Sequence, residues 1–362
     1  MADTSMFSVT YGEARRRFID AARASGAQLA HYPHAGARGP EGEALFLDAA
    51  TLGRPDAPNV MVIGCGTHGI EGFAGSGAQC AWMADGGAGR IPADVALVLL
   101  HAHNPWGFAH RQRVTEENVD LNRNFVDHAK PYPANPGYAE LHPGISPECW
   151  DEASIRGVFA TLDAFRERYG EQAFSDAYNG GQYSHPDGVF FGGHRPQWAN
   201  RAFRGAVRAH VGHARRAAII DLHTGIGPAL GHVFLCFHEP GSPAFDRVRA
   251  WWGERAVNRH GVTHKALARY QGLLIDAFQS ELPQTETTAV VVEFGTRTRP
   301  EMQKASLALR WLRCHGERDP ELARAVHADC LEAFYPSDAR WREAVLGQSR
   351  VFFDQALVGI GS

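Results

Sequence analysis

The stretch Asn59-Val-Met-Val-Ile63 is an uninterrupted apolar run, and it leads directly into the loop Gly64-Cys-Gly-Thr-His-Gly69. A short apolar run bounded by glycine is typical of a fully buried strand. Small residues follow over 71–84, where we expect a helix. Similar apolar runs, each predicted to be a strand, recur at 95–100, 217–222, 231–237 and 289–294. Apolar strands that alternate with helices form a mostly parallel sheet covered on both faces, so the sequence predicts an α/β protein.

The remaining segments are expected to surround this sheet. Residues 11–26 suit an amphipathic helix, and 27–32 and 44–49 suit two short strands around a turn. Further helices are predicted at 151–168, 199–213 and about 300–345, whereas 104–148 and 178–198 are expected to be long loops. No repeat or linker is visible, so we predict one domain over 1–362. It would comprise a catalytic core at about 55–300, an N-terminal helix and hairpin at 1–54, and C-terminal helices at 300–362.

The composition is that of an ordinary globular protein with a slight acidic excess. Thirty-six basic residues stand against 40 acidic ones, for a net charge of −4. We therefore expect no nucleic-acid partner, because phosphate binding needs a basic surplus. The six cysteines are scattered without a C-x-x-C pair, which indicates free thiols in a reducing compartment. Neither a signal peptide nor an apolar run long enough for a membrane is visible, so we expect a cytoplasmic protein without a membrane partner.

The loop at 64–69 matches the G-x-G-x-x-G fingerprint of dinucleotide-binding domains, and Asp85 follows at about the distance of the ribose-binding acid. A nicotinamide-dependent oxidoreductase is therefore one hypothesis. Two features oppose it. Asp85 does not end the next predicted strand, and His68 and Glu71 place bulky polar side chains where a pyrophosphate needs bare backbone.

His68-x-x-Glu71 is better interpreted as a pair of metal ligands at the point where a strand becomes a helix. Catalytic zinc takes three protein ligands and keeps a fourth position for water. His223, in Asp221-Leu-His223, ends another predicted strand at the same sheet edge and is the candidate third ligand. With 19 histidines and 40 acidic residues such a pair also arises by chance, and a histidine at a strand end often only caps it. Because two strand ends at one sheet edge each carry residues that can bind a metal, the metal-site interpretation is favoured over chance and over capping.

Two further segments carry charged side chains whose positions call for a structural or functional explanation. Glu293 ends the apolar run Val-Val-Val-Glu293, and burying a carboxylate is costly unless it pairs with a cation, a metal or a bound water. Either a salt bridge or a general base beside a metal-bound water would suit it. The segment from Arg113 to Asp120-Leu-Asn122-Arg123 offers guanidinium groups, which contact a carboxylate at two points. In a chain where only three of the 36 basic residues are lysine, one arginine alone would mean little.

Together these motifs resemble the zinc carboxypeptidase superfamily, which includes aspartoacylase and succinylglutamate desuccinylase deacylases. The matching motifs keep the family order over roughly residues 55–300, and they are His68-x-x-Glu71, Asp120-x-Asn122-Arg123, His223 and Glu293. The sequences of the loops that carry them resemble a bacterial branch of the superfamily near the cytoplasmic deacylases. The resemblance implies a three-layer α/β/α sandwich around a mixed, mostly parallel sheet of about eight strands. It also implies one zinc ion per chain.

The resemblance also implies a role for each matched residue. His68, Glu71 and His223 correspond to the zinc ligands, and Glu293 to the catalytic residue that activates water. Asn122 and Arg123 correspond to the clamp on the substrate's free carboxylate. Arg113 corresponds to the oxyanion arginine, with a looser match in spacing, and Asp120 to the acid behind His68. Tyr270 falls in the window of the family's mobile tyrosine, but its surroundings do not match and it is left unassigned.

The predicted function is a zinc metallohydrolase, a metallocarboxypeptidase or a deacylase, that cleaves an amide bond next to a free carboxylate. The substrate would be a small peptide or an N-acyl amino acid. The alternatives are the nicotinamide-dependent oxidoreductase and a metal-binding protein without catalysis. A catalytic base at Glu293 argues against the second of these. The side chain of the substrate and the oligomeric state are left open.

Overall fold

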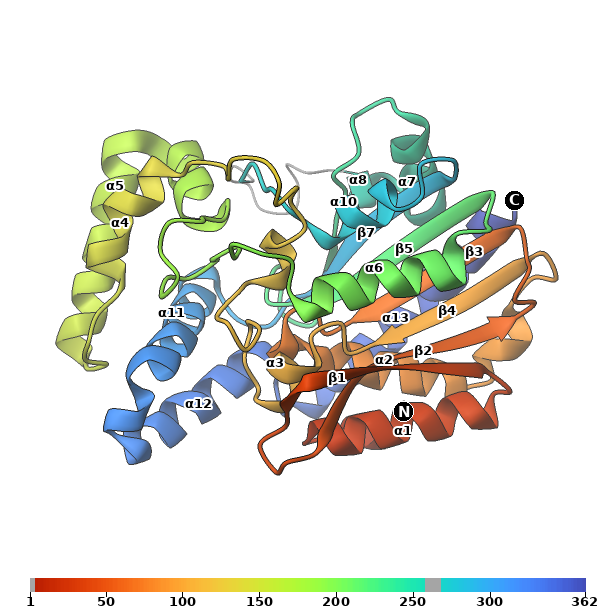
Figure 1. Ribbon diagram of the computed structural model, residues 1–362, viewed down its shortest axis with the longest axis horizontal. Coiled ribbons are helices and arrows are strands. Elements are labelled where there is room, and N and C mark those ends of the chain that lie inside the picture. The colour runs from red at the N-terminus through yellow and green to blue at the C-terminus, as the bar shows by residue number, and fades with distance from the viewer. Residues whose placement is uncertain (1–3, 258–267) are drawn as a thin grey trace.

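The structure is a computed structural model that describes residues 4–257 and 268–362 (Figure 1). Its centre is a seven-stranded sheet in the order β1-β2-β4-β3-β5-β7-β6. The strands are β1 (Gln28–Arg38), β2 (Ala44–Gly53), β3 (Asn59–Cys65), β4 (Val95–His101), β5 (Arg216–Thr224), β6 (His232–Leu235) and β7 (Glu286–Phe294). The four central strands, β4, β3, β5 and β7, run parallel, and β1, β2 and β6 are antiparallel to their neighbours.

Helices cover both faces of the sheet. One face carries α1 (Tyr11–Ala24), α2 (Gly72–Ala84), α7 (Pro243–Trp252), α8 (Glu254–Val257) and α13 (Ala339–Gly361), and the other carries α6 (Trp198–Val211) and α10 (Leu274–Ser280). Successive residues of a strand point to opposite faces. Met61 and Ile63 of β3 accordingly belong to the first core, and Val60 and Val62 belong to the second. Both faces of the central strands are thus buried, which explains their continuous apolar sequence.

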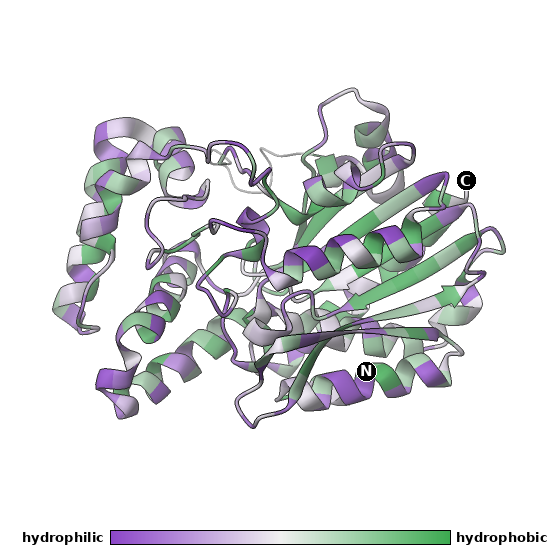
Figure 2. Cartoon of the chain, in the orientation of Figure 1, coloured by the Kyte–Doolittle hydropathy of each residue, from purple (hydrophilic) through white to green (hydrophobic). Residues whose placement is uncertain are grey.

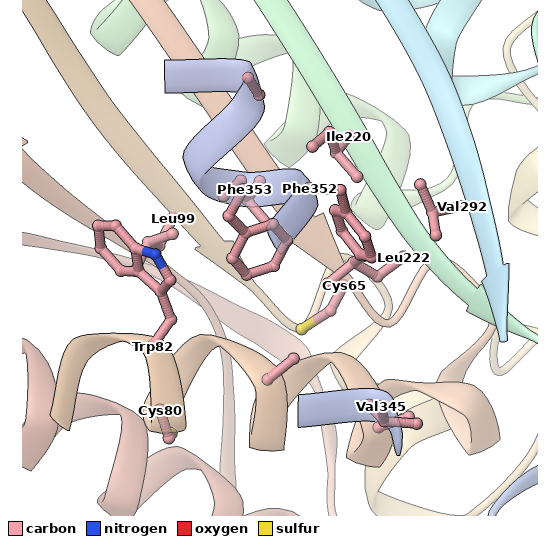
Figure 3. Packing of buried hydrophobic residues seen from close by; sticks show 14 of the residues in the cluster. Cys65, Cys80, Trp82, Leu99, Ile220, Leu222, Val292, Val345, Phe352 and Phe353 are labelled. Carbon is pink, nitrogen blue, oxygen red and sulfur yellow. The ribbon is translucent and has the colours of Figure 1, made fainter. Parts of the chain in front are cut away.

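The first core is closed by the C-terminal helix. Phe352 and Phe353 of α13 pack toward Ile220 and Leu222 of β5, which Figure 3 shows from close by. Figure 2 shows the same division of chemistry: the strands are mostly hydrophobic, and the outer helices alternate hydrophobic and hydrophilic positions. The predicted three-layer α/β/α arrangement around a mixed, mostly parallel sheet is confirmed.

A third hydrophobic core lies beyond the carboxyl ends of the parallel strands. It is built by α4 (Pro136–Ile145), α5 (Glu152–Asn179), α11 (Arg299–His315) and α12 (Pro320–Phe334), which form the lobe at the left of Figure 1. The short helix α3 (Pro105–Ala109) and the 3-10 turns η1 (Thr4–Met6), η2 (Gly69–Glu71), η3 (Gly87–Arg90), η4 (Leu121–Arg123) and η5 (Gly316–Arg318) complete the described elements.

The structure corrects three sequence predictions. The described part of the chain forms seven strands, against about eight expected. The segment 104–148 is not all loop, because Asn135 caps α4 through its side chain and Pro136 occupies the first helical turn. Proline in the first turn of a helix costs no hydrogen bond, because the N–H groups there have no partner within the helix. Asn135-Pro136 was therefore a helix start that the sequence analysis missed. The predicted helix at 151–168 extends to residue 179 across a kink at Gly170, where φ is +84°.

The six cysteines are free thiols, as predicted. No helix in the described ranges is long and apolar enough to cross a membrane.

Candidate metal centre and pocket

The predicted site residues gather at the carboxyl end of the parallel strands. His68 lies in the loop between β3 and η2, and Glu71 is the last residue of η2, directly before α2. His223 lies one residue before the end of β5, and in the sheet register its partner on β7 is Glu293. Because the three strands are parallel neighbours, their ends meet at one edge. This is where open α/β sheets bind ligands.

The side chains of His68, Glu71 and His223 converge there. Nδ1 of His68 lies 3.0 Å from Glu71 Oε1 and 3.1 Å from His223 Nδ1. His223 Nδ1 in turn lies 3.2 Å from Glu71 Oε2. All three residues are buried, and among the described residues they form the one group of three or more such side chains with the spacing of a metal site. Burial opposes ionisation of Glu71, but the nearby His68, His223 and Arg113 hold its pKa below the usual range.

A second carboxylate stands behind each imidazole. Nε2 of His68 lies 3.1 Å from Asp120 Oδ1, and Nε2 of His223 lies 2.7 Å from Asp221 Oδ2. At His223, Nε2 donates its proton to Asp221, and Nδ1 carries the free lone pair. At His68, Nε2 faces both Asp120 and the donor Nη2 of Arg113, so Nδ1 is free for a metal when Nε2 is protonated and donates to Asp120. A carboxylate behind a metal-binding histidine fixes the tautomer in this way. Two nitrogen lone pairs and an anionic carboxylate would then face one another, and a divalent cation satisfies all three. The donor set therefore fits a metal such as zinc.

Arg113 closes one side of this group. Its Nη1 donates to Glu71 Oε1 at 2.8 Å and its Nε to Asp120 Oδ2 at 3.3 Å, while Nη2 lies 2.8 Å from His68 Nε2. A guanidinium carries five N–H groups, so some remain for a ligand in the adjoining cavity, which Arg113 lines. Its positive charge lies beside the group predicted to bind the metal.

Glu293 faces the same cavity from β7. It stands outside the three-residue group, and its carboxylate accepts a hydrogen bond from the backbone N–H of Ile226 at 3.3 Å. Burial raises the pKa of Glu293 to about 7, with Glu71 adding to the rise and His223 opposing it. A carboxyl group with such a pKa can both accept and return a proton near neutral pH.

Asn122 and Arg123 lie in η4 and also line the cavity. Asn122 Oδ1 accepts from the backbone N–H of Leu274 at 2.8 Å. Two N–H groups of Arg123 donate to the carbonyls of Asn122 and Asn179, at 2.6 and 2.8 Å. Its Nε is buried and has no hydrogen-bond partner among the described residues. The guanidinium is therefore fixed in place with donors to spare.

The cavity has a volume of about 370 Å³. One wall is apolar and adjoins Arg123: Tyr270 lies under its guanidinium at 4.8 Å, and Phe237 packs edge-on against Tyr270 at 5.7 Å. Leu235, Leu273 and Val291 continue this wall. A second part of the lining comes from the end of α5 and the start of α11, and it includes Tyr178, Arg299 and Gln303.

The glycines of the dinucleotide-like loop have a packing role. A Cβ at Gly64 would lie 2.3 Å from Cε1 of His103, and one at Gly69 would lie 1.9 Å from the backbone carbon of Gly107. The space beside these glycines is thus filled by the protein itself. The nicotinamide hypothesis loses its support, because the fingerprint glycines permit close packing of the loop that carries His68.

A protein-family model described as "Protein of unknown function (DUF2817)" matches residues 7–348. The chain belongs to this family. No curated protein matches it.

Several solved structures are similar to the chain. Carboxypeptidase A from Helicoverpa armigera has 13% identity and a TM-score of 0.44, with 90% of this chain and 74% of that one covered. A succinylglutamate desuccinylase from Chromobacterium violaceum has 15% identity and a TM-score of 0.38, with 89% and 74% covered. A murein-tripeptide amidase from Escherichia coli O157 has 13% identity and a TM-score of 0.36, with 86% and 93% covered.

Sequence reasoning assigned no role to Asp221, which contacts His223 and accepts a hydrogen bond from the Thr67 hydroxyl, whose Oγ1 lies 2.8 and 3.0 Å from the two carboxylate oxygens. A signal was present, since residues two apart in a strand share a face. Tyr270 was left unassigned, yet its side chain lines the cavity.

Phe190 was also missed, and its backbone carries the clearest strain near the cavity. Its φ of +56° is unfavourable for a bulky residue, and such conformations cluster at functional sites. The ring lies 5.4 Å from the guanidinium carbon of Arg113 and 5.7 Å from that of Arg123. Phe190 thus lies close to both arginines. Nothing in the sequence around it indicated this role.

Proposed function

We propose that this protein is a zinc-dependent hydrolase that cleaves an amide bond next to a free carboxylate, in a small peptide or an N-acyl amino acid. One observation carries the proposal. Two imidazole nitrogens and a carboxylate, each imidazole backed by an acid, converge beside a buried glutamate at the edge of a cavity. The motif resemblance to zinc carboxypeptidases supports the same chemistry.

His68, Glu71 and His223 would hold one zinc ion. When bound, zinc supplies Lewis acidity that polarises the amide carbonyl and makes water more acidic. Asp120 and Asp221 keep the two imidazoles in the tautomer that presents Nδ1. A His₂Glu donor set with room for a further ligand favours zinc over harder cations, which prefer oxygen alone.

Glu293 is the proposed general base. It takes a proton from the attacking water and returns it to the nitrogen of the departing amine. Its pKa, raised by burial to about 7, suits both steps at neutral pH. The backbone N–H of Ile226 orients the carboxylate without neutralising it.

Two arginines act on the substrate's negative charges. Arg113 stabilises the charge that develops on the carbonyl oxygen, since it lies beside the ligand group and lines the cavity. Arg123, fixed by two carbonyls and left with free donors, binds the free carboxylate. Asn122 assists from the same turn.

The apolar wall beside Arg123 suggests the nature of the released amino acid. Phe237, Leu273 and Val291 line the cavity there without a charged group among them. A charged side chain would lose its hydration against this wall. We therefore propose that the amino acid carrying the free carboxylate has an apolar side chain.

The test measures metal content and turnover together. The zinc-loaded protein would be incubated with N-acyl amino acids and short peptides, and products read by mass spectrometry. Release of an apolar amino acid, lost in Glu293→Gln but kept in the matched variant Glu286→Gln on the same strand, would support the proposal. Stoichiometric zinc without turnover on any substrate would instead indicate a metal-binding protein without catalysis.

A further inference from the structure

The part of the cavity lining that comes from α5 and α11 holds hydrogen-bond donors that the protein itself leaves unused. Tyr178 and Gln303 both line the cavity and are 1% and 8% exposed. In the described part of the chain, neither Tyr178 Oη nor Gln303 Nε2 has a hydrogen-bond partner. A buried polar group without a partner destabilises the fold. Other buried groups, such as the Tyr138 hydroxyl, also have no partner, but Tyr178 and Gln303 are distinguished by lining the cavity together.

Two helices bring these donors to one wall. Tyr178, near the end of α5, stacks on Phe174 of the same helix at 5.7 Å. The guanidinium carbon of Arg299, at the start of α11, lies 6.0 Å from the Phe174 ring, and its Nη1 bonds Glu171 of α5 at 2.7 Å. Gln303 follows Arg299 by four residues, and residues so spaced share a helix face. It therefore faces the same end of α5.

This wall lies on the Arg113 side of the cavity. The ring of Phe190 contacts Tyr178 edge-on at 5.4 Å and lies 5.4 Å from the guanidinium carbon of Arg113. Arg123 lies 5.7 Å from the same ring, and its Nη2 donates to the carbonyl of Asn179, the residue after Tyr178. A substrate with its carboxylate at Arg123 and its scissile carbonyl at Arg113 would extend its acyl half toward Tyr178.

We propose that Tyr178 and Gln303 form a donor subsite that binds an oxygen acceptor on the acyl half of the substrate. The inference rests on the proposed function, which sets the direction of the substrate. Both groups can donate, and the arginines around them disfavour a basic ligand: four arginines and a single glutamate line the cavity. The preferred acyl group is therefore polar, bearing a carbonyl or carboxylate oxygen beyond the scissile bond, and is not a simple hydrocarbon chain.

The test compares two N-acylphenylalanines of equal chain length and no acyl charge. N-(5-amino-5-oxopentanoyl)phenylalanine carries a terminal amide oxygen, and N-pentanoylphenylalanine does not. Dissociation constants are measured by calorimetry on zinc-loaded Glu293→Gln protein, so that the comparison is independent of turnover, and kcat/KM is measured on the active enzyme. Each hydrogen bond to the acceptor should favour the amide ligand by about 3- to 10-fold.

Tyr178→Phe and Gln303→Leu should each remove about 3- to 10-fold of this preference, while leaving the pentanoyl compound unaffected. Tyr138→Phe is the matched control, since Tyr138 is buried in the same helical lobe and is not among the residues lining this cavity. Tyr178→Phe should also keep or raise the melting temperature, because the lost hydroxyl had no partner.

Equal binding of the two ligands, or an unchanged preference in both variants, would overturn the subsite. A fall in melting temperature for Tyr178→Phe would do so as well, because it would show that the hydroxyl has a structural partner. If the preference in binding is present but the wild type hydrolyses neither compound, the subsite stands and the proposed hydrolysis fails.

Discussion

Replacing Glu293 by glutamine separates the catalytic role of this carboxylate from its effect on the fold. The substitution keeps the shape of the side chain and an acceptor for the Ile226 N–H, but it removes the proton acceptor. Loss of a general base typically lowers turnover about 10²- to 10⁴-fold. We expect at least a 10²-fold fall in kcat with an unchanged zinc content.

Whereas kcat should fall in Glu293→Gln, the stability of the metal-free protein should rise. Burial raises the pKa of Glu293 from 4.5 to about 7. Below about pH 4.5 the group is protonated in both folded and unfolded chains and contributes nothing. Between these two pH values the unfolded chain ionises first, so stability falls as the pH rises. At 1.36 kcal/mol per pKa unit the loss above pH 7 is roughly 3 kcal/mol.

Glu293→Gln should recover this loss, so that urea unfolding in the presence of a chelator shows a gain of roughly 3 kcal/mol at pH 8 that vanishes near pH 4. Glu286→Gln, at the exposed start of the same strand, is the matched control for the substitution itself. A variant with equal or lower stability at pH 8 would refute the reasoning about burial. A variant that loses its zinc would make Glu293 a ligand, and one that keeps full turnover would mean that another group activates the water.

Three further changes test the site. His68→Ala or His223→Ala should abolish zinc binding measured by plasma mass spectrometry, and full occupancy in both would remove the ligand assignment. Asp221→Asn should weaken zinc binding about 10- to 100-fold in chelator competition, because its carboxylate lies 2.7 Å from His223 Nε2; an unchanged affinity would make this contact irrelevant to the metal. Arg123→Ala should lose roughly 2–5 kcal/mol of transition-state binding for a substrate with a free carboxylate, and kcat/KM should fall far less when that carboxylate is amidated. Equal losses on both substrates would show that Arg123 does not bind the carboxylate.

Much of the fold could be predicted because its signals are local. The central strands are apolar at every position since both their faces are buried, and that pattern is readable without knowing the partners. The ligand candidates were visible for a related reason. His68, Glu71 and His223 are polar residues placed directly at the ends of such runs, and parallel strands end at one edge of a sheet.

The residues that support the ligand candidates and the arginines were not predicted, because their roles depend on contacts that local sequence patterns do not encode. Asp221 precedes His223 by two residues, but only the fold shows that its carboxylate reaches the imidazole and is bonded by Thr67. The strained conformation of Phe190 likewise has no sequence signal, because the residue is neither glycine nor asparagine. The short helix α4 was missed because its glycines and its internal Pro143 are typical of a loop, although its buried residues Tyr138, Leu141 and Ile145 have helical spacing.

The sequence by itself determined the layered α/β architecture and the chemistry at the strand ends, because periodicity and strand-end polarity act within a few residues. The tertiary structure alone decided which walls enclose the cavity. Tyr178 and Gln303 belong to helices that lie far apart in the chain and meet through the third hydrophobic core and the Arg299–Glu171 ion pair. Whether a buried hydroxyl or amide finds a partner depends on atoms from distant segments, and no pattern of neighbouring residues can reveal that.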